Sequence, residues 1–210
     1  IDHIFVSKNI ISNNYYGIDL GDSCEKFTIS HNNISNNYYG VSLSPSVYNI
    51  ISNNSINNNY YGVRLYYSEH NIISNNSINM NFNEGIISIG NRWDFIQDNH
   101  IINNGEQGIY LDGLYNTISG NNISNNGQNG LEITTISNTI SNNIIFHNYG
   151  DGINVDADSQ KITNNIISYN TGSGIEINSN SNTISGNTIL CNLDQGVRVY
   201  GTSNSLSGNT

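Results

Sequence analysis

Aliphatic residues recur along the chain at fixed distances, separated by runs of Asn, Ser and Gly. A glycine followed by an apolar–polar–apolar triplet, as in GIDL, GVSL and GVRL, returns every 22 or 23 residues. Alternation of this kind predicts a short strand whose alternate side chains face inward. The fourth repeat, GIISIG, departs from the pattern by one residue. The nine glycines of this column are Gly17, Gly40, Gly62, Gly85, Gly108, Gly130, Gly152, Gly174 and Gly196.

An asparagine precedes each of these glycines, and an isoleucine stands three residues before each asparagine. Another strand signal comes before the isoleucine, in forms such as NIISNN and NTISGN. Three short strands in a period of 22–23 residues predict an all-β fold, a right-handed single-stranded parallel β-helix of about nine coils. Identical side chains would then stack about 4.8 Å apart, and buried asparagines would hydrogen-bond along the stack and to turn backbone. The predicted ladder comprises Asn14, Asn37, Asn59, Asn81, Asn104, Asn126, Asn148, Asn170 and Asn192.

The first three coils share the sequence Asn-Asn-Tyr-Tyr-Gly, with two residues between the ladder asparagine and the glycine. The other six coils have three residues there, so the first three are expected to share one turn geometry. The glycine is expected to supply a backbone conformation that other residues avoid. The tyrosines are expected to form two aromatic stacks, which either pack within the turn or face solvent as a carbohydrate-binding platform. The stacked residues would be Tyr15, Tyr38 and Tyr60 in one row and Tyr16, Tyr39 and Tyr61 in the other.

Composition and charge exclude some classes of function. Charged residues make up 10% of the chain and its formal net charge is −10, with six scattered Lys and Arg residues. Nucleic-acid binding needs clustered basic side chains, so this class is excluded. An asparagine content of about a fifth with low charge also occurs in disordered segments, but the regular period argues against disorder here. No run of about 18 apolar residues predicts a membrane span.

The repeating units, for example NTISGNNISNNGQNGLEI, resemble the parallel β-helix repeats of the pectin-lyase-like superfamily. They are most similar to the Asn-rich kind found in surface proteins and in NosD-like periplasmic proteins, and the resemblance covers essentially the whole chain. It implies an extracellular, cell-surface or periplasmic location. The superfamily includes polysaccharide lyases, hydrolases, epimerases, phage tailspikes and non-catalytic surface proteins, so the resemblance selects no single activity.

The same resemblance places a carbohydrate cleft along the sheet that the glycine triplets form. Two carboxylates one or two coils apart suit glycoside hydrolysis, and a carboxylate with Arg and Tyr could abstract and return a sugar proton. The alternative is a solvated strand face with a cross-strand pair of Glu176 and Arg198. The Arg-x-Pro-x-x-Arg, Asp-Asp and Asp-Pro-His motifs of the catalytic families are missing, which weighs against catalysis. If the protein is an enzyme, the candidate catalytic residues are Tyr110, Glu132, Asp151, Glu176 and Arg198.

Metal and redox signals are weak. Asp151, Asp156 and Asp158 in DGINVDADS could bind Ca²⁺, but the Gly-Gly-x-Gly-x-Asp repeat is missing, and a solvated acidic edge is the alternative. The histidines fall at different phases of the repeat, so no other metal site and no cofactor is predicted. Cys24 and Cys191 would lie about seven coils apart, too far for a disulfide.

Residues 1–210 are expected to form one β-helix domain. Neither end shows a polar cap, so the chain is expected to be a fragment, or an uncapped part, of a larger protein or assembly. The favoured function is a rigid extracellular or envelope scaffold, or an adhesin-like surface protein that could bind glycans or other surface proteins. The alternatives are a carbohydrate-active lyase, hydrolase or epimerase using the acidic face of coils five to nine, and a subunit that stacks end to end into a filament.

Overall fold

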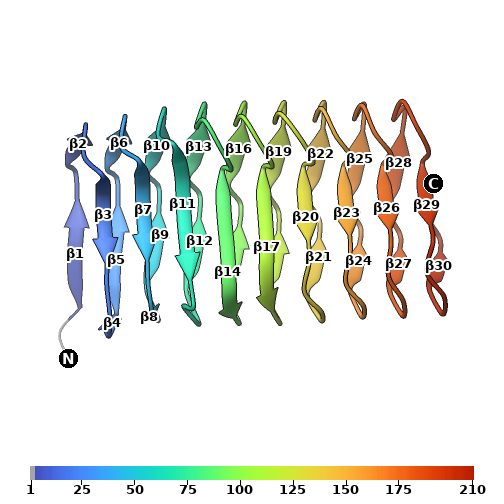
Figure 1. The fold of residues 1–210 in the computed structure, drawn as a ribbon, viewed down its shortest axis with the longest axis horizontal. Coiled ribbons are helices and arrows are strands. Elements are labelled where there is room, and N and C mark those ends of the chain that lie inside the picture. Colours follow the sequence, from blue (N-terminus) through green and yellow to red (C-terminus); the bar gives the residue numbers. More distant parts are fainter. Residues whose placement is uncertain (1–2) are drawn as a thin grey trace.

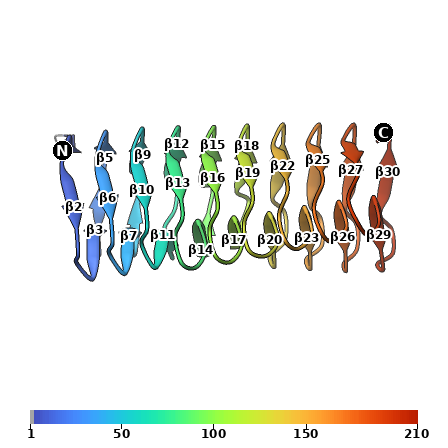
Figure 2. The same ribbon diagram turned by 90° about the horizontal axis from the view of Figure 1, so that it is seen from above.

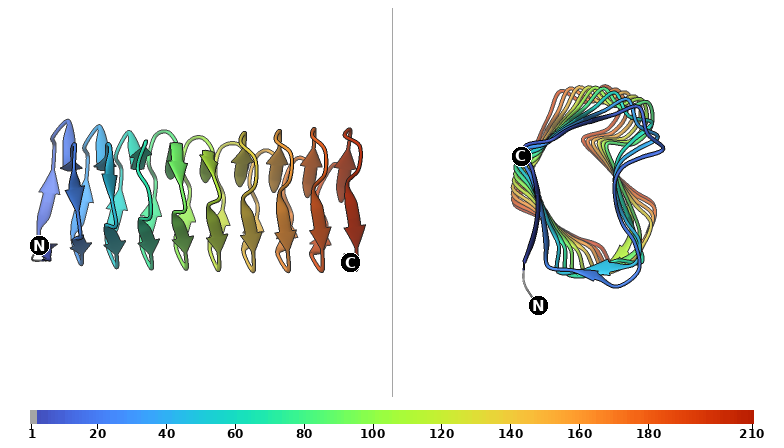
Figure 3. Two further views of the ribbon diagram at one scale, coloured as in Figure 1. Left: turned by 90° about the horizontal axis from the view of Figure 1, so that it is seen from below. Right: turned by 90° about the vertical axis from the view of Figure 1, so that its left-hand side faces the viewer.

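The computed structural model describes residues 3–210 as a solenoid of strands and turns, with no helix among them. Each coil adds one strand to each of three parallel sheets, and the coils follow one another in sequence order along the axis (Figures 1 and 2). Viewed along that axis, successive coils lie over one another (Figure 3). The predicted parallel β-helix of about nine coils, with three strands in each, is therefore confirmed.

The three sheets are named here in chain order within a coil. Sheet A contains β1 (Ile4–Ser7), β5 (Phe27–Ser30), β9 (Ile50–Ser52), β12 (Ile72–Ser74), β15 (Phe95–Gln97), β18 (Thr117–Ser119), β21 (Thr139–Ser141), β24 (Lys161–Thr163), β27 (Thr183–Ser185) and β30 (Ser205–Ser207). Sheet B contains β2 (Ile10–Ser12), β6 (Asn33–Ser35), β10 (Ser55–Asn57), β13 (Ser77–Asn79), β16 (His100–Ile102), β19 (Asn122–Ser124), β22 (Ile144–Phe146), β25 (Ile166–Ser168) and β28 (Thr188–Leu190). Sheet C contains β3 (Tyr16–Leu20), β7 (Tyr39–Leu43), β11 (Tyr61–Tyr66), β14 (Ile86–Arg92), β17 (Ile109–Leu114), β20 (Leu131–Ile133), β23 (Ile153–Val155), β26 (Ile175–Ile177) and β29 (Val197–Val199). Two further short strands, β4 (Cys24–Glu25) and β8 (Ser46–Val47), pair with each other beyond sheet C.

Inward-facing aliphatic side chains from all three sheets fill the interior. Sheets A and B each contribute the central residue of a three-residue strand, such as Ile118 and Ile123, and sheet C contributes two residues per strand, such as Leu131 and Ile133. All four of these side chains are fully buried. Parallel in-register pairing stacks isoleucine on isoleucine from coil to coil, which produces one continuous apolar core.

The fourth coil keeps the register of the other coils although its sequence departs from the pattern. Ser88 pairs with Leu65 on one side and Leu111 on the other, so it occupies the inward position of the second apolar residue. Its hydroxyl is buried and accepts a hydrogen bond of 2.9 Å from the Nδ2 group of Asn91. The additional residue of this coil is taken up later, by a register shift between Ile89 and Arg92. The departure is thus a change of residue type followed by a bulge.

The recurrent glycine is required for a reason other than the expected one. Residues of this column do not have positive φ; the glycines that do are Gly90, Gly120, Gly186 and Gly208. A Cβ atom on Gly130 would instead lie 2.7 Å from the carbonyl oxygen of Gly152 and 2.5 Å from the Cγ2 atom of Ile145. Close approach of neighbouring coils, not an unusual backbone conformation, therefore excludes a side chain here.

The predicted asparagine ladder is present between sheets B and C, and we call it the BC ladder. In its central part, the backbone N–H and the Nδ2 group of Asn126 both donate to Oδ1 of Asn148, at 3.1 and 2.9 Å. The Nδ2 group also donates to the carbonyl oxygen of Ile101 in the preceding coil, at 3.2 Å. The two end members differ from the prediction of a buried column, because Asn14 is exposed and Asn192 is half-buried.

Two further ladders were not predicted. The AB ladder joins the turns between sheets A and B and consists of Asn9, Asn32, Asn54, Asn76, Asn99, Asn121, Asn143, Asn165, Asn187 and Asn209. The CA ladder precedes the strands of sheet A and consists of Asn49, Asn71, Asp94, Asn116, Asn138, Gln160, Asn182 and Asn204. In the central coils, each of the three turns is therefore closed by a buried amide, or by the Asp94 carboxyl in one coil, which satisfies backbone groups that the turn would otherwise leave unpaired.

The residue before each ladder position adopts a left-handed backbone conformation throughout the central coils. Asn142, which precedes Asn143, has φ of 56°, and Gly120 and Gly186 occupy the same column with φ of 68° and 66°. This conformation turns the chain and points the next side chain inward. It costs an L-residue about 1–2 kcal/mol, although asparagine tolerates it better than most.

This conformation gives a prediction for Asn142. Its side chain is exposed and forms no hydrogen bond within residues 3–210. Asn142→Val is expected to lower the free energy of unfolding by about 1–2 kcal/mol, whereas Asn142→Gly should change it little. Chemical denaturation of both variants measures the effect, with Ser141→Val in the neighbouring strand as control. Equal stability of the Val and Gly variants would contradict the assigned backbone strain.

Candidate functional site

The outer face of sheet C carries a line of polar side chains over coils five to nine. Parallel pairing places Tyr110 beside Glu132, Glu132 beside Asn154, Asn154 beside Glu176, and Glu176 beside Arg198. All five residues are half-buried and belong to successive strands, from β17 to β29. We call this line the polar track. The repeat period determines its order, because each member follows a glycine of the repeat by two residues.

Glu132 is held between two amides. Its carboxylate accepts hydrogen bonds from the Nδ2 groups of Asn129 and Asn154, the latter at 3.0 Å. Burial raises the pKa of the Glu132 carboxyl, and the two amide donors oppose that rise. The charge of Asp156, which also accepts a hydrogen bond from Asn154 at 3.2 Å, raises the pKa further.

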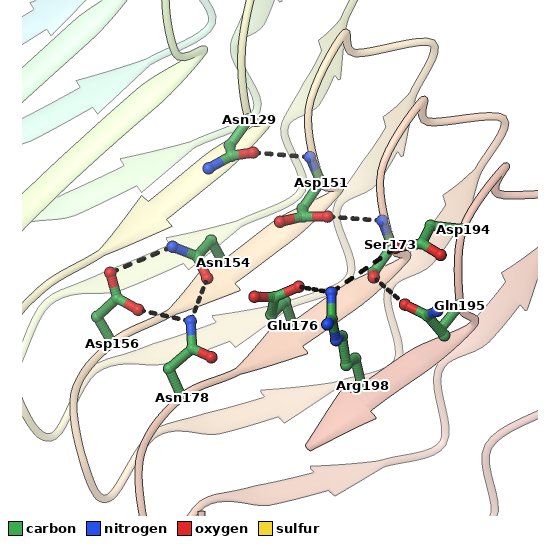
Figure 4. A network of polar contacts seen from close by, with 10 residues as sticks. All are labelled: Asn129, Asp151, Asn154, Asp156, Ser173, Glu176, Asn178, Asp194, Gln195 and Arg198. Atoms are coloured by element: carbon green, nitrogen blue, oxygen red, sulfur yellow. Dashed lines mark hydrogen bonds and ion pairs between the residues drawn. The ribbon is translucent and has the colours of Figure 1, made fainter. Parts of the chain in front are cut away.

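Asp151 is fixed at the edge of the polar track by main-chain contacts. Its backbone N–H donates to Oδ1 of Asn129 at 2.7 Å, and the backbone N–H of Ser173 donates to its carboxylate at 2.6 Å (Figure 4). Burial raises the pKa of Asp151, and the negative charges of Glu176 and Glu132 add to this effect. The structure therefore brings the three predicted carboxylates into one electrostatic environment.

Arg198 closes the track at its C-terminal end. Its guanidinium lies 3.5 Å from Glu176 and 3.8 Å from Asp194 (Figure 4). It also lies over the ring of Tyr200, 4.7 Å from the ring centroid. The cross-strand pair expected for a solvated face is thus present. Both partners remain partly accessible, so the pair contributes little to stability.

Asp156 and Asp158, proposed with Asp151 as calcium ligands, lie beyond the end of β23. Asp156 accepts a hydrogen bond from Nδ2 of Asn178, and Asp158 accepts one from the backbone N–H of Asn180. Within residues 3–210, no group of three or more His, Cys, Asp or Glu side chains is arranged to hold a metal ion.

The tyrosines of the first three coils form the two predicted stacks. In the outer row the ring centroids of Tyr15, Tyr38 and Tyr60 are 4.8 and 4.7 Å apart, and the rings are nearly parallel. The second row, Tyr16, Tyr39 and Tyr61, has spacings of 5.3 and 5.2 Å and meets the outer row edge to face. The outer row is exposed, at 59%, 36% and 41%.

The geometry of these stacks limits how they can bind a sugar. A pyranose stacks on an aromatic ring through the flat face of that ring. Both faces of Tyr38 are already covered by its neighbours, so within each row only the terminal faces and the ring edges remain. Carbohydrate binding at the tyrosines stays a prediction, restricted to those positions.

A pocket of about 450 Å³ lies beside sheet C and was not predicted. Gly90, with φ of 69°, is one of its lining residues, and a Cβ atom on Gly90 would lie 2.6 Å from the ring of Tyr67. Arg92 forms no ion pair within the described residues, although two carboxylates line the same pocket. We call it the sheet C pocket; it is lined by Tyr67, Glu69, Gly90, Asn91, Arg92, Asp112, Gly113, Leu114 and Thr135.

The fold and this lateral polar surface define a parallel β-solenoid with a candidate ligand-binding face. The right-handed β-helix region family matches residues 2–138 and 84–210, and the chain belongs to that family. No curated protein matches the sequence. None of the residues described forms a helix that is long and apolar enough to cross a membrane.

Solved structures share the fold at low sequence identity. A periplasmic alginate epimerase is 18% identical with a TM-score of 0.73, and the match covers 88% of this chain and 51% of the epimerase. The A-module of a mannuronan C-5 epimerase from Azotobacter vinelandii is 16% identical with a TM-score of 0.72, covering 89% of this chain and 65% of that one. The Dettilon tailspike protein is 14% identical with a TM-score of 0.73, and the match covers 98% of this chain and 54% of the tailspike. The chain thus spans about half to two thirds of the length of these proteins.

Proposed function

We propose that the protein is an extracellular or periplasmic β-helix that binds a neutral glycan along the polar track and into the sheet C pocket. The observation that supports this proposal most directly is the register of the polar track, in which five half-buried polar side chains follow one another at the interstrand spacing. The track and the pocket share β17, which contains Tyr110 of the track and Asp112 of the pocket. An elongated polymer with regularly spaced hydroxyl groups suits such a surface.

The electrostatics of the face favour a neutral ligand. The chain has a net charge of −10, and Glu132, Asp151, Glu176 and Asp194 lie along or beside the track with Arg198 as its one cation. A polyanion would be repelled by these carboxylates, whereas the hydroxyl groups of a neutral sugar can donate hydrogen bonds to them. Alginate and mannuronan are polyanionic, so the proposed ligand differs in charge from the polymers named for the two epimerases.

The contacts of the carboxylates favour binding over catalysis. Glu132 already accepts two amide hydrogen bonds, Glu176 is paired with Arg198, and Asp151 is held by Ser173. Groups that are positioned in this way can orient a ligand without exchanging protons. The ladders add a rigid backbone to the face, because every strand of the track is tied at its turns to the coils on either side.

One observation supports a second candidate, a carbohydrate-active enzyme. Burial raises the pKa of both Glu132 and Asp151, which is the direction required for a general acid at neutral pH. Under this alternative Glu132 or Asp151 would protonate or deprotonate the bound sugar. Chain shortening, new unsaturated ends or epimerised units in the incubated polymer would reveal it.

The binding proposal predicts that Arg198→Ala weakens glycan binding about tenfold, since hydrogen bonds to charged groups contribute about 1.5–3 kcal/mol. Lys161→Ala is the matched control, because it removes one positive charge from β24 on the outer face of sheet A. Titration calorimetry with soluble neutral β-glucan, mannan and galactan measures the affinity of both variants. The chain length of the incubated polymers is then measured. Equal weakening by the two substitutions, or no binding of any neutral polymer, would refute the proposal. If the protein changes one of these polymers and Glu132→Gln abolishes that turnover, the enzyme alternative replaces the binding proposal.

A further inference from the structure

A second pocket lies on another edge of the solenoid, at the turns between sheets B and C in coils six to eight. Its volume is about 400 Å³. None of its residues belongs to the polar track or to the sheet C pocket, and none carries a carboxylate, ammonium or guanidinium group. We call it the BC pocket; it is lined by Asn125, His147, Tyr149, Tyr169 and Thr171.

Two rows of side chains border the BC ladder, and together they build the pocket. The first row consists of the left-handed residues Asn125, His147 and Tyr169, each of which precedes a ladder asparagine. The rings of His147 and Tyr169 are stacked with centroids 5.2 Å apart, so this wall is aromatic and ordered. The second row follows the ladder asparagines and contains Gly127, Tyr149 and Thr171, which the backbone bonds of consecutive coils place one above another.

Tyr149 differs from the other tyrosines of its row because its ring has no stacking partner. In the first three coils this row holds Tyr15, Tyr38 and Tyr60, whose rings cover one another. In coil six the corresponding residue is Gly127, and a Cβ atom there would lie 2.0 Å from the carbonyl oxygen of Gly105, so no side chain fits. In coil eight it is Thr171. The ring of Tyr149 consequently has an uncovered face and is 72% exposed.

We propose that the BC pocket binds a neutral pyranose, with the apolar face of the sugar on the ring of Tyr149. The C–H groups on that face of a pyranose are attracted by the electron-rich face of an aromatic ring. The Asn125 amide, the Thr171 hydroxyl and the His147 imidazole border the same space and can exchange hydrogen bonds with the sugar hydroxyls. The absence of charged groups from the lining selects an uncharged sugar over a uronate or a sugar phosphate. Tyr149 is the one aromatic residue of the pocket whose ring has no stacking partner within residues 3–210, so the ligand is a single unit at the end or on a branch of a glycan.

This site is independent of the function proposed for sheet C. The face of sheet C would hold an extended chain, whereas the BC pocket holds one ring at a different edge. Variants can separate the two, since Arg198→Ala should leave the BC pocket unaffected and Tyr149→Ala should leave binding along sheet C unaffected.

Saturation-transfer difference NMR with the whole chain tests the BC pocket directly. The probes are the methyl glycosides of glucose, galactose, mannose and N-acetylglucosamine at millimolar concentration. At least one is expected to bind, with saturation strongest at its ring C–H protons. Tyr149→Ala should weaken that binding by at least about tenfold, and Tyr149→Phe, which keeps the ring face, should retain most of it.

Phe82→Ala is the matched control. Phe82 occupies the same row in coil four and is 75% exposed, but it does not line the pocket. Because Tyr149 is also mostly exposed, its truncation should leave the melting temperature nearly unchanged, and a thermal melt confirms that each variant is folded. The proposal is overturned if none of the four glycosides binds, if Tyr149→Ala binds as tightly as the unmodified chain, or if Phe82→Ala weakens binding equally.

Discussion

Asp94→Asn is expected to stabilise the protein by about 4 kcal/mol above pH 7 and to have little effect near pH 4. Asp94 is the acidic member of the CA ladder, where its neighbours are amides, and it is 1% exposed. The pKa of its carboxyl is raised to about 7, mainly by burial and also by the charge of Glu69, while the hydrogen bonds from Asn71 oppose the rise. Each unit by which the folded pKa exceeds the ordinary value of 3.8 corresponds to about 1.4 kcal/mol.

The geometry of the ladder explains the cost of the charge. One carboxylate oxygen of Asp94 accepts hydrogen bonds from the backbone N–H and the Nδ2 group of Asn71, at 2.7 and 3.2 Å. The other oxygen is buried without a partner, and Nδ2 of Asn116 in the next coil is also unpartnered within residues 3–210. An asparagine at position 94 would place an amide donor at the position of this unpartnered oxygen, as the other asparagines of the ladder do. The folded state would then no longer contain an unpaired buried charge, so this source of instability would be removed.

The sign of the pH dependence follows from the raised pKa. The folded state holds a proton on Asp94 between pH 4 and 7 that the unfolded state releases. The stability from this group is therefore fully present below about pH 4 and is lost as pH rises through about 7. Denaturation midpoints from pH 4 to 9 should fall with pH in the unmodified chain and much less in Asp94→Asn. Asp98→Asn, at an exposed position four residues away, is the control and should keep the slope. A slope unchanged in Asp94→Asn would refute this assignment.

Asn121→Ala is expected to lower the free energy of unfolding by about 3–5 kcal/mol. Asn121 is fully buried in the AB ladder, and its Nδ2 group donates to Asn143 and to the carbonyl oxygens of Ile96 and Ser119. Its Oδ1 atom accepts from the backbone N–H and the Nδ2 group of Asn99, both at 3.0 Å. Truncation leaves the backbone N–H of Asn99 buried and unpaired, at about 1–3 kcal/mol, and removes the other four hydrogen bonds, worth about 0.5–1.5 kcal/mol each. Water that enters the cavity would keep the total at the lower end of their sum.

Asn14→Ala provides the comparison for this effect. Asn14 is the first member of the BC ladder, but it is exposed, so water can replace the hydrogen bond from its Nδ2 group to Asn37. Its substitution should cost about 1 kcal/mol or less. Thermal or chemical denaturation of the two variants measures the difference. Similar losses at both positions would show that the ladder does not stabilise the solenoid through buried hydrogen bonds.

Sequence reasoning identified the residues of the polar track, because a fixed period determines which side chains are neighbours. Glu132, Asn154 and Glu176 each follow a column glycine by two residues, and parallel pairing then brings them side by side. The contacts of these side chains were not predictable, because they depend on turn residues whose identity changes from coil to coil. The bonds of Asn129 to Glu132 and to Asp151 are of this kind.

The two pockets were missed for a common physical reason. Gly90 lies beside Tyr67 in one pocket, and Gly127 precedes Tyr149 in a row of the other. The period gives the residues of each row. Whether the space between neighbouring side chains stays open depends on how those side chains pack, which the period does not give.

The sequence by itself determined the period, the three strands of each coil, the apolar core and one asparagine ladder, since in-register parallel stacking repeats any residue placed every 22 or 23 positions. The tertiary structure alone decided which asparagines are buried in the other two ladders, why the column glycines are required, and that Asp94 is a buried acid within a row of amides. These features depend on how closely consecutive coils approach one another and on which atoms meet between them. Such distances arise from packing, and the pattern along a single coil does not contain them.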